Sequence, residues 1–205
     1  MEEADMSQAV KQPGDIYQDL LNLPDDITGE IINGELHTQP RPAPRHALAS
    51  SSLGGELDGP YFKGRGGPGG WWIIDEPEIH LGDDILVPDI AGWKKERMPK
   101  LPETAFFDVS PDWICEVLSQ NTVRKDRIFK MPLYAKYGVQ HIWLLDPLVK
   151  TLEVYQLETQ YWKLIGTFSE NDNVSISPFQ EISIDLSFLW GEQYVSTIPA
   201  RNGLR

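Results

Sequence analysis

The sequence predicts an α/β domain in which a central twisted mixed β-sheet is flanked by α-helices. An apolar run at residues 113–118 is followed by a helical pattern at 123–137 and then by a second apolar run at 142–145. This order is that of a βαβ unit, for which a right-handed crossover is expected. The run at 142–145 is apolar on both faces, as in a central strand.

Two hairpins are expected on either side of this unit, and their antiparallel strands make the predicted sheet mixed. Asn33-Gly34 stands between strand-like residues in 30–36 and supplies the two positive φ angles that a type I′ turn requires. Residues 151–155 and 161–168 alternate between apolar and polar side chains, which is typical of a meander hairpin.

The remaining elements complete the domain. Asp15 is expected to cap a short helix that ends at Leu21, because Asp is a favoured N-cap residue. A second helix is expected at about 45–57. Further strands are expected at 71–74, 78–81 (continuing or pairing with the previous one), 85–91 and, closing the domain, within 178–189.

The 205 residues are enough for one sizeable domain and few for two. We expect one folded domain over 15–192, with a flexible N-terminal tail at 1–14 and a C-terminal tail at 193–205. No apolar run approaches the roughly 18 residues of a membrane span. The acidic N-terminus lacks the features of a signal peptide, and a single cysteine, Cys115, fits a reducing compartment. A cytoplasmic protein without a membrane partner is therefore expected.

The formal net charge of −13 is unevenly distributed. Residues 1–30 carry eight acids and one base, whereas the segments 94–100 and 124–130 each carry four bases and one acid. Each basic segment follows one of two apolar runs that contain a carboxylate. The clusters are either ordinary solvated faces or phosphate-binding groups, and charge alone leaves both interpretations open.

The two carboxylates in apolar runs are the candidate functional residues. Asp89 lies in 85–91 and Glu116 lies in 113–118. Because an unpaired buried carboxylate is costly, two of them suggest a positive partner between them, and our candidate is a divalent metal. Pro88 cannot donate to a ladder, so its strand is expected at an edge or with a bulge. The alternative is that each acid pairs with a nearby arginine.

The helix after Glu116 favours the metal interpretation. Helical spacing predicts a polar and aromatic stripe of Arg127, Lys130, Tyr134 and Tyr137 beside an apolar stripe of Ile128, Met131 and Ala135. Lys130 can then fold back over the carboxylates. Pro132 is expected to kink this helix.

These residues resemble the PD-(D/E)XK nuclease superfamily, with Pro88-Asp89 as the first motif and Glu116 as the second acid. More closely, the chain resembles the Uma-two type family of restriction endonucleases over about residues 15–190. The matching segments are 29–35, His46, 87–89, 111–119, Asp126 with Lys130 and Tyr134, Gly138-Val139 and 143–147. Leu118 stands where the superfamily has its lysine, and the resemblance moves that role to Lys130.

The resemblance implies a restriction-endonuclease-like fold and Mg²⁺- or Mn²⁺-dependent hydrolysis of DNA phosphodiester bonds by a homodimer. Asp89, Glu116 and Lys130 would be catalytic, and Glu30 would join the two acids at the metal. Phosphates would contact four basic residues, Lys94, Lys95, Arg124 and Arg127. Two alternatives stay open: a catalytically weak module of this fold that binds nucleic acid or a protein, and a structure-selective, resolvase-like nuclease.

Two other features receive simpler interpretations. The glycine-rich segment 64–70 is expected to be a mobile surface loop, because it lacks the Gly-Lys-Ser/Thr ending of a phosphate-binding loop. His46 either approaches the site or is a hydrogen-bonded structural histidine. The histidines show no zinc-ligand spacing to one another or to Cys115.

Overall fold

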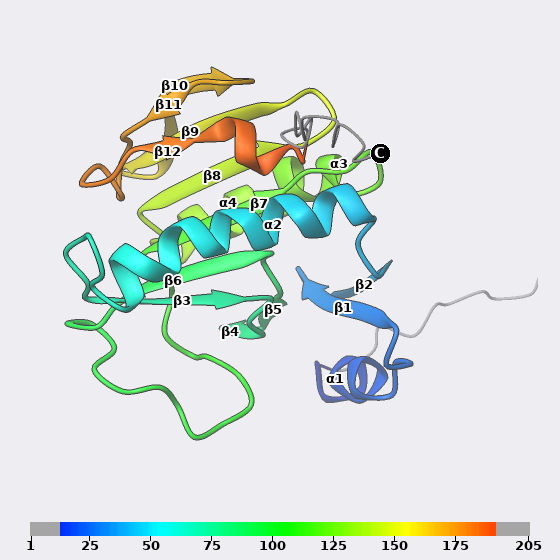
Figure 1. Ribbon diagram of the computed structural model, residues 1–205. Coiled ribbons are helices and arrows are strands. Elements are labelled where there is room, and N and C mark those ends of the chain that lie inside the picture. The colour runs from blue at the N-terminus through cyan, green and yellow to red at the C-terminus, as the bar shows by residue number, and fades with distance from the viewer. Residues whose placement is uncertain (1–12, 192–205) are drawn as a thin grey trace, which may run out of the picture.

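A computed structural model describes residues 13–191 (Figure 1). The expected C-terminal tail lies outside the described residues, as does the expected N-terminal tail apart from residues 13 and 14, which begin the first helix. No helix in the described range is long and apolar enough to cross a membrane. The elements follow the order α1 (Pro13–Leu21), β1 (Ile27–Ile32), β2 (Glu35–Pro40), α2 (Pro44–Leu57), the π-helix η1 (Asp58–Phe62), β3 (Trp71–Asp75), β4 (Ile79–Leu81), β5 (Asp84–Leu86), β6 (Ile90–Lys94), β7 (Trp113–Val117), α3 (Val123–Lys125), the π-helix η2 (Asp126–Lys130), α4 (Met131–Lys136), β8 (His141–Asp146), β9 (Thr151–Glu158), β10 (Tyr161–Ser169), β11 (Asn173–Val174), β12 (Ile184–Asp185) and the 3₁₀ helix η3 (Leu186–Leu189).

The central element is a six-stranded sheet of order β10-β9-β8-β7-β6-β3. Strands β7 and β8 are parallel and joined through α3, η2 and α4, while their neighbours pair antiparallel, which confirms the βαβ unit and the mixed sheet. Helix α2 packs through Ala49, Leu53 and Leu57 on one face of the sheet, together with the C-terminal segment. The crossover helices pack on the opposite face (Figure 1).

A second, four-stranded sheet has the order β2-β1-β5-β4. Strands β1 and β2 form the predicted hairpin, and Asn33 and Gly34 have the positive φ angles, 52° and 79°, that its turn requires. The hairpin of β9 and β10 is confirmed as well, with a register shift between Leu164 and Gly166.

The expected strand at 85–91 is wrong as a single element. Its first part forms β5 in the four-stranded sheet, and its last part belongs to β6 in the six-stranded sheet. Pro88 lies at the break, where a residue without a backbone N–H cannot continue a ladder. Residues 78–81 likewise pair with β5 and not with β3. Asp89 is therefore placed where the chain passes from one sheet to the other.

The crossover helix contains a π-helical turn, η2, immediately before α4, which carries Pro132 in its first turn. The proline removes one backbone donor and crowds the preceding turn, and a π turn accommodates an extra residue at such a point. The turn changes the phase of the helix. Ile128, expected on the buried apolar stripe, is 58% exposed, whereas Lys130 and Tyr134 are buried.

Candidate active site

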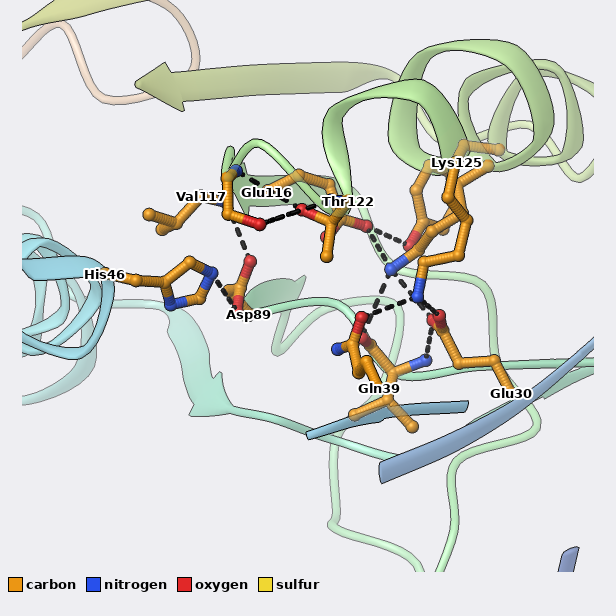
Figure 2. A network of polar contacts seen from close by, with 12 residues as sticks. Glu30, Gln39, His46, Asp89, Glu116, Val117, Thr122 and Lys125 are labelled. Atoms are coloured by element: carbon orange, nitrogen blue, oxygen red, sulfur yellow. Dashed lines mark hydrogen bonds and ion pairs between the residues drawn. The ribbon is translucent and has the colours of Figure 1, made fainter. Parts of the chain in front are cut away.

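Asp89 lies beside the end of the strand that carries Glu116. Ile90 of β6 pairs with Cys115 of β7, and Asp89 and Glu116 are the residues that adjoin this last pair of the ladder. The backbone N–H of Val117 donates to Oδ2 of Asp89 at 2.7 Å (Figure 2). Asp89 comes directly before β6 and Glu116 lies near the end of β7, so the two carboxyl groups lie at the same end of neighbouring strands. Glu116 contacts Lys130 and Tyr134 of the crossover, whereas Asp89 contacts His46 of α2.

Lys130 connects Glu116 to the N-terminal sheet. Its ammonium lies 2.8 Å from Oε1 of Glu30 and 2.8 Å from Oε1 of Glu116, and it donates to the carbonyl of Val87 at 3.2 Å. These acceptors engage the three hydrogens of the ammonium group. The Tyr134 hydroxyl also donates to Oε1 of Glu116, at 2.6 Å. Lys130 is therefore a buried bridge between two acids.

Glu30 holds a second lysine in place. Lys125 donates to Oε2 of Glu30 at 2.5 Å and to Oε1 of Gln39 at 2.7 Å, as Figure 2 shows. The N–H of Val87 donates to Oε1 of Glu30 at 2.9 Å. Burial by itself raises the pKa of Glu30, but the charges of Lys130 and Lys125 outweigh it, and the net effect is a lowered pKa. Glu30 is thus a buried anion that positions both lysines.

Carboxyl groups outnumber lysines in the site. Burial raises the pKa of Glu116 to about 8, with further contributions from Asp126 and Asp89 and opposition from Lys130. Burial likewise raises the pKa of Asp126 to about 6. Four carboxyl groups, those of Glu30, Asp89, Glu116 and Asp126, lie near two lysines, so an added cation would favour their ionised forms.

His46 approaches the site from α2, as one of the two open interpretations required. Its Nε2 lies 3.3 Å from Oδ1 of Asp89 (Figure 2). Burial lowers the pKa of His46, but the hydrogen bond and the charge of Asp89 raise it by a larger amount. The net effect is a raised pKa. Its Nδ1 is buried and has no hydrogen-bond partner among the described residues.

A pocket of about 520 Å³ opens beside Asp89. Its wall includes His46, Lys125, Arg124 and Phe129. The side chain of Lys125 is 13% exposed, whereas that of Lys130 is 2% exposed and does not belong to the wall. Lys125 is therefore the lysine that a molecule in the pocket meets.

The four predicted phosphate-binding residues separate in the structure. Arg124 lines the pocket, but Arg127 forms a two-point ion pair with Glu153, at 3.0 and 2.7 Å. Lys94 and Lys95 lie at the other end of β6 from Asp89, about 16 Å away at the usual rise of a strand. There the ammonium of Lys95 lies over the rings of Phe62 and Trp72. The structure does not bring Lys94 and Lys95 to the carboxylates.

Lys125 belongs to the basic segment 124–130, but the sequence did not single it out as a site residue. Its spacing of five residues from Lys130 places the two on one side only when the turn between them is π-helical, and sequence periodicity does not reveal that turn. Gln39, at the end of the N-terminal hairpin, was also missed, and no sequence signal marks it.

The comparisons with known proteins concern the family and the fold. Residues 17–187 match the family model described as "Uma2: Putative restriction endonuclease". The chain belongs to the Uma2 family. A solved structure described as "a putative nuclease belonging to DUF820" from Anabaena variabilis is similar to it, with a TM-score of 0.67 and 25% identity over 84% of this chain and 96% of that one. The restriction-endonuclease-like fold predicted from the sequence is confirmed.

A curated protein from Arabidopsis thaliana, named "Putative F-box/kelch-repeat protein", is 26% identical over 113 residues. The match covers 53% of this chain and about 30% of the length of that relative.

The donor chemistry of the Uma2 site fits a hard divalent cation. Asp89 and Glu116 offer carboxylate oxygens, which are the ligands that Mg²⁺ prefers, and a bound cation would favour the ionised form of Glu116. The described residues contain no group of three or more His, Cys, Asp or Glu side chains arranged to hold a metal. Mg²⁺ is commonly held by one or two carboxylates while water and phosphate complete its shell, so two carboxylates are sufficient.

Proposed function

We propose that this Uma2 protein is a divalent-metal-dependent endonuclease that hydrolyses DNA phosphodiester bonds. The observation that carries the proposal is that Asp89 binds the backbone N–H of Val117, the residue after Glu116, beside a pocket whose wall includes Arg124 and Lys125. Membership of a restriction endonuclease family and the nuclease-like fold support the same chemistry.

Asp89 and Glu116 would hold Mg²⁺ or Mn²⁺. When bound, such an ion polarises a phosphodiester and lowers the pKa of a coordinated water. Glu30, expected from the sequence as a further ligand, has both carboxylate oxygens engaged by Val87, Lys125 and Lys130. We therefore assign Glu30 to positioning the two lysines.

The other residues of the site would position the two carboxylates and contact the phosphates. Lys130 and Tyr134 fix the orientation of the Glu116 carboxylate through contacts at 2.8 and 2.6 Å. Val117 and His46 fix the two oxygens of Asp89. A phosphate in the pocket would meet the ammonium of Lys125, which offsets the negative charge that develops during hydrolysis. Arg124 on the pocket wall would contact a neighbouring phosphate.

The test is cleavage of supercoiled plasmid and of labelled oligonucleotides in MgCl₂ or MnCl₂, with EDTA as the blank. Asp89→Asn and Glu116→Gln keep the shapes of the side chains and remove their charges, so both should abolish cleavage. Glu103→Gln, at an exposed acid in the loop between β6 and β7, is the matched control and should cleave like wild type. Cleavage that survives both site variants contradicts the proposal.

The same wild-type and variant proteins distinguish this proposal from one alternative, a binding module of the same fold that does not cleave DNA. In a binding module of this fold, calorimetry would show metal binding that requires Asp89, while no DNA substrate is cleaved. The complete burial of Lys130 between two acids is the observation compatible with that alternative, because it withholds this lysine from substrate.

A further inference from the structure

The pocket beside Asp89 has an aromatic wall that the hydrolysis of a phosphodiester does not require. Phe129 and His37 both line the pocket, and their ring centroids lie 5.9 Å apart. The guanidinium carbon of Arg124 lies 5.8 Å from the centroid of Phe129, on the same wall. Phe129 is half-buried, so part of its ring remains accessible from the pocket.

An aromatic ring with an adjacent guanidinium is the chemistry that recognises the face of a nucleobase. Stacking on aromatic side chains and arginine planes holds unpaired bases in proteins that bind single strands. A base within a duplex is stacked on its neighbours and does not present its face. A base that reaches Phe129 must therefore be unpaired.

The depth of the site leads to the same conclusion. The Asp89 side chain is only 15% exposed and that of Glu116 only 3%, so a scissile phosphate has to enter the recess to reach them. The pocket volume of about 520 Å³ is in the range of small-molecule sites. A pocket of this size is too small to enclose a segment of double helix. The net charge of −13 disfavours electrostatic attachment to a duplex, whereas Arg124 and Lys125 supply local positive charge in the pocket.

We propose that the pocket is a subsite for one unpaired nucleotide, with the base against Phe129 and its phosphate near Lys125, and that the substrates are single-stranded or branched DNA. This inference rests on the proposed nuclease function and names its substrate class. His37 and the plane of the Arg124 guanidinium would complete the base-binding wall, and the N–H groups of Arg124 would still reach the neighbouring phosphate.

The test measures binding without turnover, by fluorescence anisotropy of the full chain in CaCl₂ with labelled DNA. The probes are a single strand, its blunt duplex, a duplex with a single-stranded flap, and the single strand with one abasic position. We expect the single strand and the flap to bind about tenfold more tightly than the duplex, and a suitably placed abasic position to weaken binding by about tenfold.

Phe129→Leu keeps an apolar side chain and removes the ring, so it should lose about tenfold in single-strand affinity and become insensitive to the abasic position. Phe129→Trp should bind like wild type. Phe188→Leu, at an exposed phenylalanine of η3, is the matched control and should also bind like wild type. If Phe129→Leu does not fold, His37→Ala provides the same comparison.

Equal affinity for duplex and single strand, or a Phe129→Leu protein with wild-type affinity, would overturn the subsite. These outcomes are independent of catalysis. If Phe129 and the abasic probe behave as expected while no metal supports cleavage, the subsite stands and the proposed hydrolysis fails. If duplex plasmid is cleaved and Phe129 has no effect on binding, hydrolysis stands and the subsite fails.

Discussion

The ammonium group of Lys130 lies 2.8 Å from Oε1 of Glu116, and both side chains are almost completely buried. The lysine comes from the π-helical turn of the crossover and the glutamate from near the end of the strand that precedes it. Neither charge has bulk water as an alternative partner. The orientation of the Glu116 carboxyl group therefore depends on a lysine that the substrate does not touch.

Replacing Lys130 by methionine should strongly destabilise the protein, because Glu30 and Glu116 are then left buried without their shared cation. We expect a loss of about 3–5 kcal/mol in the free energy of unfolding, measured by urea denaturation at pH 7. The matched control is Lys163→Met, which removes an exposed ion pair with Glu158 and should change stability by less than about 1 kcal/mol. Equal losses in the two variants would contradict the bridging role of Lys130.

Lys125→Ala should affect turnover more than stability, because Lys125 lines the pocket while its buried partner Glu30 keeps the ion pair with Lys130. We expect kcat/KM for DNA cleavage to fall by about a hundredfold, as for the loss of one group that stabilises developing charge. Lys100→Ala, at an exposed lysine, should retain wild-type kinetics. A Lys125→Ala enzyme with full activity would show that this lysine does not meet the phosphate.

Asp126 should make stability depend on pH below neutrality. Burial raises its folded-state pKa to about 6, above the ordinary value of 3.8. Between these values the folded chain binds the proton more tightly than the unfolded chain, so the Asp126 contribution to stability falls as pH rises from about 4 to about 6.

The Asp126→Asn variant cannot titrate at this position. The difference between its free energy of unfolding and that of wild type should therefore increase by about 1 kcal/mol per pH unit as the pH rises from about 4 to about 6. Urea denaturation at pH 4, 5, 6 and 7 measures the difference. The exposed Asp108→Asn serves as the control and should follow the wild-type curve. A constant difference between Asp126→Asn and wild type would mean that Asp126 titrates normally.

Binding of a divalent ion should stabilise the folded chain. At a MgCl₂ concentration about tenfold above Kd, the gain is about 1.4 kcal/mol, or a rise in Tm of roughly 3–6 °C for a chain of this size. Differential scanning fluorimetry with and without MgCl₂ measures it. Asp89→Asn should lose the shift, and Glu103→Gln should keep it. A shift that persists in Asp89→Asn would place the ion elsewhere.

Features that follow directly from the pattern of contiguous residues were predicted correctly from the sequence, whereas the turn that arises from a local conflict was not. The Asn33-Gly34 hairpin depends on two φ angles, and the βαβ unit depends on the apolar pattern of contiguous residues, so both were predictable. The π turn was not, because it arises from the conflict between Pro132 and the preceding helical turn. Its effect on helical phase explains why the predicted apolar stripe was wrong at Ile128 and why Lys125 was not assigned.

By itself the sequence determined that two carboxylates lie in apolar surroundings, since local hydrophobicity around Asp89 and Glu116 is a property of contiguous residues. Only the tertiary structure decided what surrounds them. The chain passes from one sheet to the other at Pro88, Glu30 enters from the N-terminal hairpin, and His46 enters from α2. Such partners are separated from one another by tens of residues, and their meeting depends on sheet register and helical phase, which no local pattern encodes.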